Sequence, residues 1–184
     1  DKVAKMLNLG YPGGPVISKS AEKGNPKKYN LPRPMLNQKN YNFSFSGLKT
    51  AVLYLLKELF LLESYSIIKG SLRVKRDIAA SFQQAVVDVL VTKTIRAAKE
   101  YKAKSVLLSG GVSANKLLRR TLEKESKSLK FSYSQPDFEY TGDNAAMIGL
   151  AGYYESKFSA KGGSATGGKS LKAEPNLKIR SWIS

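Results

Sequence analysis

Apolar residues recur at helical spacing over two long stretches of this chain. In the first, Ser46 stands where a helix N-cap is expected, and the apolar positions after it fall on one helix face. Those positions are Leu48, Val52, Leu55, Leu56 and Leu59. In the second stretch, residues 72–102, the same spacing joins Ile78, Phe82, Val86, Val89 and Leu90. Both stretches are therefore predicted to be helices that turn one apolar face to a core.

The first quarter of the chain predicts two short helices and then a long loop. The pattern of residues 1–10 is helical and ends at Gly10, and Pro15 can open a second helix that runs to about Lys23. Residues 25–42 are polar and contain three prolines, which is typical of a loop. Aromatic residues and serines then alternate over residues 43–46, a period that predicts a short strand.

Strands and helices alternate in the second half of the chain. Strands are predicted over residues 105–109 and 129–134, and helices over 114–128 and 144–158. This alternation favours an α/β domain with a largely parallel sheet. We expect one α/β lobe over residues 1–158 that is incomplete at its N-terminus, a flexible linker over 159–170, and a docking tail over 171–184.

The charge of the chain points to its partners. Lysine and arginine number 31 against 14 acidic residues, a formal net charge of +17, and basic residues concentrate within 19–39 and 157–180. Such an excess favours a polyanionic partner, of which nucleic acid is the first candidate. A basic protein without such a partner remains the alternative.

Two residue types are missing from the chain, which contains no histidine and no cysteine. Imidazole bases and thiolate ligands are therefore excluded, and the lack of cysteine fits a reducing cytoplasm. No stretch approaches the roughly 20 uncharged apolar residues of a membrane span, so no membrane is expected. The chain opens on Asp1, within a helical pattern, rather than on Met, and we expect it to be a piece of a longer protein.

Two glycines separate the strand predicted at 105–109 from the helix that follows it. Gly110 and Gly111 could form a tight turn, or they could let the backbone approach a ligand that a Cβ would exclude. Ligands of open α/β sheets bind beyond the carboxyl ends of the strands, which is where this turn falls. Asn115, close after the glycines, could contact a nucleotide or simply cap the helix.

A second junction carries an acidic residue at the start of the last predicted helix. In the segment YTGDNAAMIG, Asp143 and Asn144 could cap the helix, or Asp143 could offer its carboxylate to a cation. One carboxylate does not make a metal site, so the other ligands would have to come from elsewhere.

Six motifs, taken in order, resemble one known family. They are LGYPGGPVI, LPRPM, FSFSGLKTAV, DIAASFQQAVVDVL, LSGGVSANKLLR and GDNAAMIGLAGYY. Together they are similar to the C-terminal half of the TsaD family, the tRNA N6-adenosine threonylcarbamoyltransferases. The resemblance implies the fold of the actin, Hsp70 and sugar-kinase superfamily (ASKHA), in which two α/β lobes enclose a nucleotide cleft. This chain would be mainly the second lobe and the C-terminal tail.

The resemblance also implies site residues. Asp1 would contact the substrate sugar, Gly14 would lay its backbone against the substrate, and Asn115 would contact the nucleotide. Gly110 and Gly111 would contact the adenosine moiety. Asp143 would bind a divalent metal, Fe²⁺ or else Zn²⁺, whose histidine ligands belong to an H-x-x-x-H motif that this chain lacks. One departure concerns the last motif, because the family usually reads C-T-D-N where this chain has Tyr140-Thr141-Gly142-Asp143-Asn144.

The implied activity is transfer of the threonylcarbamoyl group from threonylcarbamoyl-AMP to N6 of adenosine 37 in tRNAs that decode ANN codons. The implied partners are tRNA and, in a bacterium, TsaB-like and TsaE-like proteins, with a cytoplasmic location. No catalytic side chain is assigned, and the chain alone is expected to be inactive. Two alternatives stay open. One is another enzyme of the superfamily, such as a small-molecule kinase or carbamoyltransferase, and the other is a non-catalytic tRNA-binding partner of such an enzyme.

Overall fold

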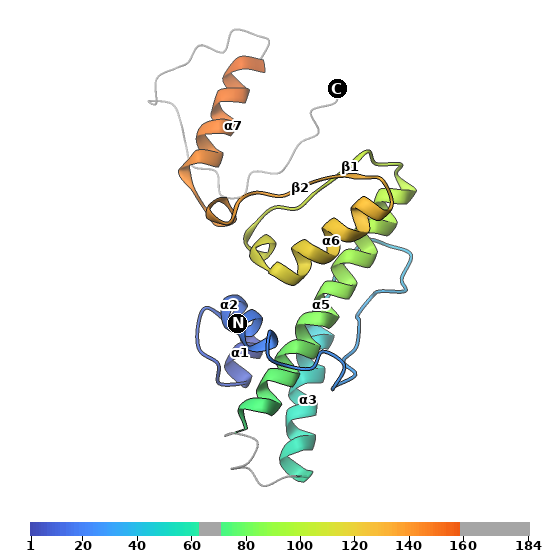
Figure 1. Cartoon of the computed structure of the whole chain (residues 1–184), viewed down its shortest axis with the longest axis vertical. Helices are drawn as coiled ribbons and strands as arrows, with labels where there is room; N and C mark the ends of the chain where they lie inside the picture. Colours follow the sequence, from blue (N-terminus) through green and yellow to red (C-terminus); the bar gives the residue numbers. More distant parts are fainter. Residues whose placement is uncertain (63–70, 159–184) are drawn as a thin grey trace. The chain divides into compact units, whose positions relative to one another are not determined.

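The structure, a computed structural model, describes residues 1–62 and 71–158 (Figure 1). The chain divides into two compact units, Asp1–Gly142 and Asp143–Ser184, and each is described by itself. The linker predicted at 159–170 and the tail predicted at 171–184 lie outside the described residues. In the described ranges, no helix has the length and apolar character that crossing a membrane requires.

Helix α5, Leu72–Glu100, is the longest element of the first unit and carries both of its apolar clusters. Its N-terminal half packs with α1 (Lys2–Met6), α2 (Gly13–Ala21) and α3 (Ser46–Leu62), which bury Leu7, Ile17, Leu48 and Val52 beside Ile78. Its C-terminal half buries Val87, Val91 and Ile95 against Val106, Leu118 and Leu122. The apolar stripes read from the sequence are therefore confirmed as core faces.

A small parallel sheet lies beside the C-terminal half of α5. Strand β1, Ser105–Leu107, pairs with β2, Ser132–Ser134, and Val106 faces Tyr133 in the register. The chain passes from β1 to β2 through the 3₁₀ helix η1, Gly111–Ala114, and helix α6, Lys116–Ser128. This strand–helix–strand crossover confirms the predicted α/β class with parallel pairing, although both strands are shorter than predicted.

The prediction of a strand at residues 43–46 was wrong. Residues 43–45 are irregular, because no strand of the described residues runs beside them to form a ladder. Phe43 and Phe45 still point the same way, as the alternation required, and their rings stack 6.5 Å apart. Ser46, predicted as the N-cap, is instead the first helical residue, since the amide of Lys49 already donates to the carbonyl of Phe45.

The loop at residues 25–42 is fixed along α5 by side chains of that helix. The Asp77 carboxylate accepts the amide of Asn25 at 2.7 Å, and Arg33 pairs with Asp88 at 2.7 Å. Arg96 donates to three loop carbonyls at alternate positions, those of Leu36, Gln38 and Asn40. Lys93, fully buried, donates to the carbonyl of Asn42 at 2.5 Å. The predicted loop is thus confirmed, and it is tied down along its length.

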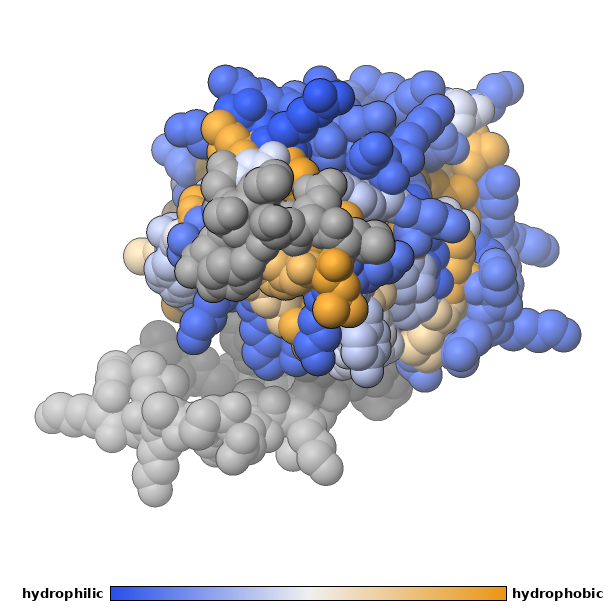
Figure 2. All heavy atoms as spheres, turned by 90° about the horizontal axis from the view of Figure 1, so that it is seen from below, coloured by the Kyte–Doolittle hydropathy of each residue, from blue (hydrophilic) through white to orange (hydrophobic). Residues whose placement is uncertain are grey.

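Some apolar side chains of the first unit are not covered by the described residues. On α3 these include Leu53, Tyr54 and Leu61, the last of which is 88% exposed. Figure 2 shows apolar atoms among mostly hydrophilic ones on the face seen from below.

The described part of the second unit is helix α7, Ala145–Phe158. The side-chain oxygen of Asn144 accepts the amide of Met147 at 2.9 Å and so caps the helix. The helix predicted from residue 144 to residue 158 is confirmed to within one residue.

Candidate functional site

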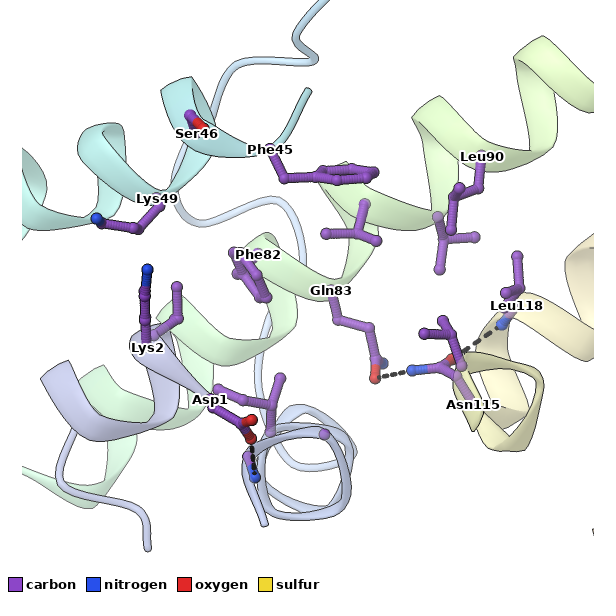
Figure 3. A pocket seen from close by; sticks show the side chains of 17 residues that line it. Asp1, Lys2, Phe45, Ser46, Lys49, Phe82, Gln83, Leu90, Asn115 and Leu118 are labelled. Carbon is purple, nitrogen blue, oxygen red and sulfur yellow. Dashed lines mark hydrogen bonds between the residues drawn. The ribbon is translucent and has the colours of Figure 1, made fainter. Parts of the chain in front are cut away.

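A pocket of about 560 Å³ opens in the first unit where α1, α2, α3, α5 and the start of α6 converge (Figure 3). One wall is apolar and is formed mainly by α5, with Phe82, Val86 and Leu90. The polar groups at its edges come from separate segments of the chain, namely Asp1, Lys2, Ser46, Lys49, Gln83 and Asn115. An apolar wall facing a few convergent polar groups is the usual make-up of a small-molecule site.

Asp1 is placed by the N-terminus of α2. Its carboxylate accepts the amide of Gly13 at 2.7 Å, where the positive end of the helix dipole favours a negative charge. Position 13 requires glycine, since a Cβ there would lie 2.4 Å from the Cα of Asp1. The neighbouring Gly14 differs, because a Cβ at that position would meet nothing within 4 Å. Gly14 therefore presents bare backbone to open space in the pocket.

Asn115 joins three helices. Its side-chain oxygen accepts the amide of Leu118 at 3.0 Å, so the capping interpretation is confirmed. Its NH₂ group donates to the Gln83 oxygen of α5 at 2.8 Å and to the Ser18 hydroxyl of α2 at 2.9 Å. Ser18 donates in turn to the same Gln83 oxygen at 2.7 Å. Contact of Asn115 with a nucleotide stays a prediction.

The two glycines of the turn have different requirements. Gly110 has φ 82° and ψ 171°, a conformation that is essentially restricted to glycine, which confirms the turn interpretation for this position. Gly111 has no such backbone constraint, and a Cβ on either residue would meet nothing within 4 Å. The chain itself therefore leaves open space beside both glycines. A ligand contact there is compatible with this space and stays a prediction.

A second pocket, of about 890 Å³, lies on the other side of Asn115. It shares Gly14, Gln83, Val112 and Asn115 with the first pocket. Its further polar and aromatic lining comes from α2, α6 and η2 (Phe138–Tyr140) and includes Ser18, Lys19, Glu22, Lys116, Arg120 and Phe138, together with the backbone of Gly111. The Asn115–Gln83–Ser18 network is thus the partition between two adjoining cavities.

The structure brings together most of the residues singled out from the sequence. Asp1, Gly14 and Asn115 line the first pocket, Gly111 lines the second, and Gly110 precedes Gly111 in the turn. Asp143 is the first residue of the other unit, and its side chain is exposed. Over residues 1–62 and 71–158, no three His, Cys, Asp or Glu side chains are grouped so as to hold a metal ion.

Sequence reasoning missed the polar residues that organise this site. Gln83 contacts both Ser18 and Asn115, yet it lies within a helix that was interpreted only for its apolar stripe. Its signal was the pair of glutamines that interrupts the apolar run of α5. Lys2 and Lys49 were also missed, since nothing in their local sequence marks them as pocket residues.

Comparison with known proteins gives the same family as the motifs. A family model, TsaD, described as tRNA N6-adenosine threonylcarbamoyltransferase, matches residues 1–150. A relative of that name from Thermosipho africanus is 48% identical over 179 residues, which is 97% of this chain and 50% of the relative. Relatives of the same name from Thermotoga neapolitana (48% identical, 85% of this chain, 45% of the relative) and Ralstonia pickettii (47% identical, 83% and 43%) agree.

The chain spans about half the length of the curated relatives it matches. The family match covers both pockets and extends through Asp143. This chain belongs to the TsaD family.

Proposed function

We propose that this chain acts in the biosynthesis of threonylcarbamoyladenosine in tRNA. It would help to transfer the threonylcarbamoyl group from threonylcarbamoyl-AMP to N6 of adenosine 37 in ANN-decoding tRNAs, in the cytoplasm. The observation that carries the proposal is the convergence of Asp1, Gly14 and Asn115, three residues that the family resemblance singles out, on one pocket. The names of the relatives supply the reaction.

The first pocket suits a ligand with chemically different ends. The apolar wall with Phe82 and Val86 can cover an uncharged part of an adenylate, while Lys2 and Lys49 offer positive charge to its anionic groups. Gly14 and Gly111 leave room for the ligand to approach the backbone. We assign to these residues the binding and orientation of threonylcarbamoyl-AMP.

The proposed reaction is an acyl transfer. The N6 amine of adenosine attacks the carbamoyl carbon, the bond from that carbon to the phosphate oxygen breaks, and AMP leaves. The proton that the amine loses passes to solvent water. Holding the adenylate still beside the incoming amine is a contribution that needs no side-chain base, since orientation alone can lower the barrier by several kcal/mol. This fits a chain without histidine, to which we assign no catalytic side chain.

A divalent metal, Fe²⁺ or Zn²⁺, would need ligands that this chain does not contain. Fe²⁺ and Zn²⁺ sites favour imidazole or thiolate ligands, and this chain has neither histidine nor cysteine. Asp143 alone does not fit such an ion, so the remaining ligands would have to come from outside these 184 residues. We therefore assign no step of the reaction to a metal.

The wider assignments follow from family membership. We propose that the chain forms mainly the second lobe of an ASKHA-type protein, and that TsaB-like and TsaE-like proteins are its partners if the source is bacterial. The alternative, a non-catalytic tRNA-binding partner, is favoured by the charge of +17. Binding of the adenylate separates the two, because a pure RNA-binding module has no reason to bind threonylcarbamoyl-AMP.

The test is calorimetric titration of the 184-residue chain with threonylcarbamoyl-AMP, before and after Gly14→Ala. A Cβ at Gly14 has open space, so the melting temperature should stay within about 2 °C. Affinity should nevertheless fall about tenfold or more, because the methyl group occupies space that the ligand needs. Gly149→Ala on α7 is the matched control, since a Cβ there also meets nothing, and it should leave affinity unchanged. Equal affinities for wild type and Gly14→Ala would contradict the proposed site.

A further inference from the structure

Helix α6 has two contrasting faces. Leu118 and Leu122 are buried against α5, whereas Lys116, Arg120 and Lys124 are exposed. The three cations follow one another at intervals of four residues, so they form a single stripe that extends along the helix for roughly 12 Å. We call these three residues the α6 stripe.

The α6 stripe leads into the second pocket. Lys116 and Arg120 line that pocket, whereas Lys124 lies one turn further along the helix and does not. Lys19 of α2 adds a third exposed cation to the lining.

No acidic side chain in residues 1–62 and 71–158 forms an ion pair with any of these four cations. Among the residues that the structure describes, the ion pairs join Arg33 to Asp88 and Lys127 to Glu123, and none includes the α6 stripe or Lys19. Glu22 lines the same pocket, and neither ion pair of the described residues includes it. Because Lys127 already engages Glu123, the positive charge of the stripe is left for an external anion.

An aromatic ring stands in the same pocket. Phe138 lines it and is 55% exposed. The ring packs against the buried guanidinium of Arg119, whose central carbon lies 4.1 Å from the ring centroid. Arg119 is held in turn by the carbonyls of Ser113 and Pro136. Arg119 thus holds the Phe138 ring in place, and the ring keeps an exposed surface in the pocket that Lys116, Arg120 and Lys19 also line.

We propose that the α6 stripe, Lys19 and Phe138 form the surface that binds an unpaired strand of the RNA substrate. The cations would contact successive phosphates while a base stacks on Phe138, a combination that single-stranded nucleic acids are known to favour. A small adenylate has one phosphate, so it cannot contact all the cations of a stripe that extends beyond the pocket to Lys124. The choice of tRNA as the RNA rests on the proposed function.

The experiment measures binding of a fluorescently labelled, unmodified ANN-decoding tRNA to the full 184-residue chain by anisotropy, between about 50 and 200 mM KCl. Replacing the stripe with Lys116→Gln, Arg120→Gln and Lys124→Gln should weaken binding at least tenfold. The plot of log K against log salt should also become less steep, its negative slope decreasing in magnitude by about two to three. Each lost phosphate contact removes roughly 0.7 to 0.9 from that magnitude.

The matched control removes three exposed positive charges elsewhere, with Lys5→Gln, Lys57→Gln and Arg73→Gln on α1, α3 and the first turn of α5. It should retain most of the affinity and of the salt slope. Equal losses in the two triple variants would mean that only net charge matters, and would overturn the proposal. So would a wild-type chain that binds no tRNA.

Phe138→Leu tests the stacking interaction separately. Loss of one stacked base should weaken binding about fivefold or more while leaving the salt slope unchanged. Circular dichroism melting should show that this variant is folded, since Leu keeps an apolar contact for Arg119. A folded variant with unchanged affinity would remove Phe138 from the proposed surface.

Titration with threonylcarbamoyl-AMP distinguishes this inference from the proposed function. Lys124→Gln lies outside both pockets and should leave affinity for the adenylate unchanged while it weakens tRNA binding. If the adenylate binds and the stripe proves irrelevant to tRNA, the proposed function stands and this inference fails. If the stripe binds tRNA but no adenylate is bound, the surface stands and the transferase assignment fails.

Discussion

Replacement of Asn115 should show how much of the first unit depends on the network between its two pockets. Asn115→Ala removes the cap of α6, which is worth about 1 kcal/mol. It also removes two side-chain hydrogen bonds, to Gln83 and Ser18, worth about 1 kcal/mol each. The bond between Ser18 and Gln83 survives, so neither partner is left without an interaction. The expected loss of stability is about 3 kcal/mol.

Asn115→Ser separates the cap from the bridge. A serine oxygen can still accept the amide of Leu118, but its side chain is too short to reach α2 and α5. The serine variant should therefore lose about 2 kcal/mol, and the difference of about 1 kcal/mol from alanine measures the cap alone. At about 3 °C per kcal/mol for a unit of this size, the melting temperature should fall by about 9 °C for alanine and about 6 °C for serine.

Urea unfolding followed by far-UV circular dichroism is the assay, because helices supply most of the regular structure of this chain. The m-value should not change, which would show that the variants alter stability and not the extent of unfolding. A loss below about 1 kcal/mol for Asn115→Ala would refute the network as described. Equal losses for alanine and serine would refute the cap.

Three further predictions concern single positions. Gly24→Ala should destabilise the chain by about 3 kcal/mol or more in the same assay, since its Cβ would lie 2.0 Å from the carbonyl oxygen of Arg76 on α5. Gly110→Ala should cost about 1 to 3 kcal/mol because of its backbone conformation, whereas Gly111→Ala should cost less than about 0.5 kcal/mol. Burial, with a smaller contribution from neighbouring Arg96, lowers the pKa of Lys93 below 10.5, so the unfolded chain binds more protons at pH values between the lowered pKa and 10.5. Stability should therefore rise with pH across that window, as urea midpoints would report, and a Lys93→Met variant should lack this rise.

The elements that could be predicted from sequence are those with a strong local signal. Helix α5 repeats its apolar spacing from Ile78 to Leu90, and the crossover from β1 to β2 has an apolar strand, a glycine turn and an amphipathic helix in succession. These signals do not depend on distant residues. The failed strand at 43–46 shows the opposite case, because alternation predicts only that side chains share a face, and a strand also needs a neighbour.

The sequence predicted those residues of the candidate site that belong to recognisable motifs. It did not predict the residues that only the fold brings into the site. Gly14 and Asn115 belong to recognisable motifs, whereas Gln83 and Ser18 matter because folding brings α2 and α5 to Asn115. Of the two interpretations offered for Asn115, the helix cap is confirmed and the nucleotide contact stays a prediction. The side-chain oxygen of Asn115 caps α6, while its NH₂ group donates to Gln83 and Ser18 and so forms part of the partition between the pockets.

The polar residues of α5 explain how a loop of this length can be ordered at all. Backbone groups without a ladder still need hydrogen-bond partners, and residues 25–42 have no strand beside them among the described elements. Asp77, Lys93 and Arg96 supply those partners to Asn25, to Asn42 and to the carbonyls between them. Lys93 is fully buried, although lysine is rarely buried without a partner. Its ammonium holds the end of the loop just before Phe45 and Ser46 enter the first pocket, so the loop and the pocket wall are fixed by the same helix.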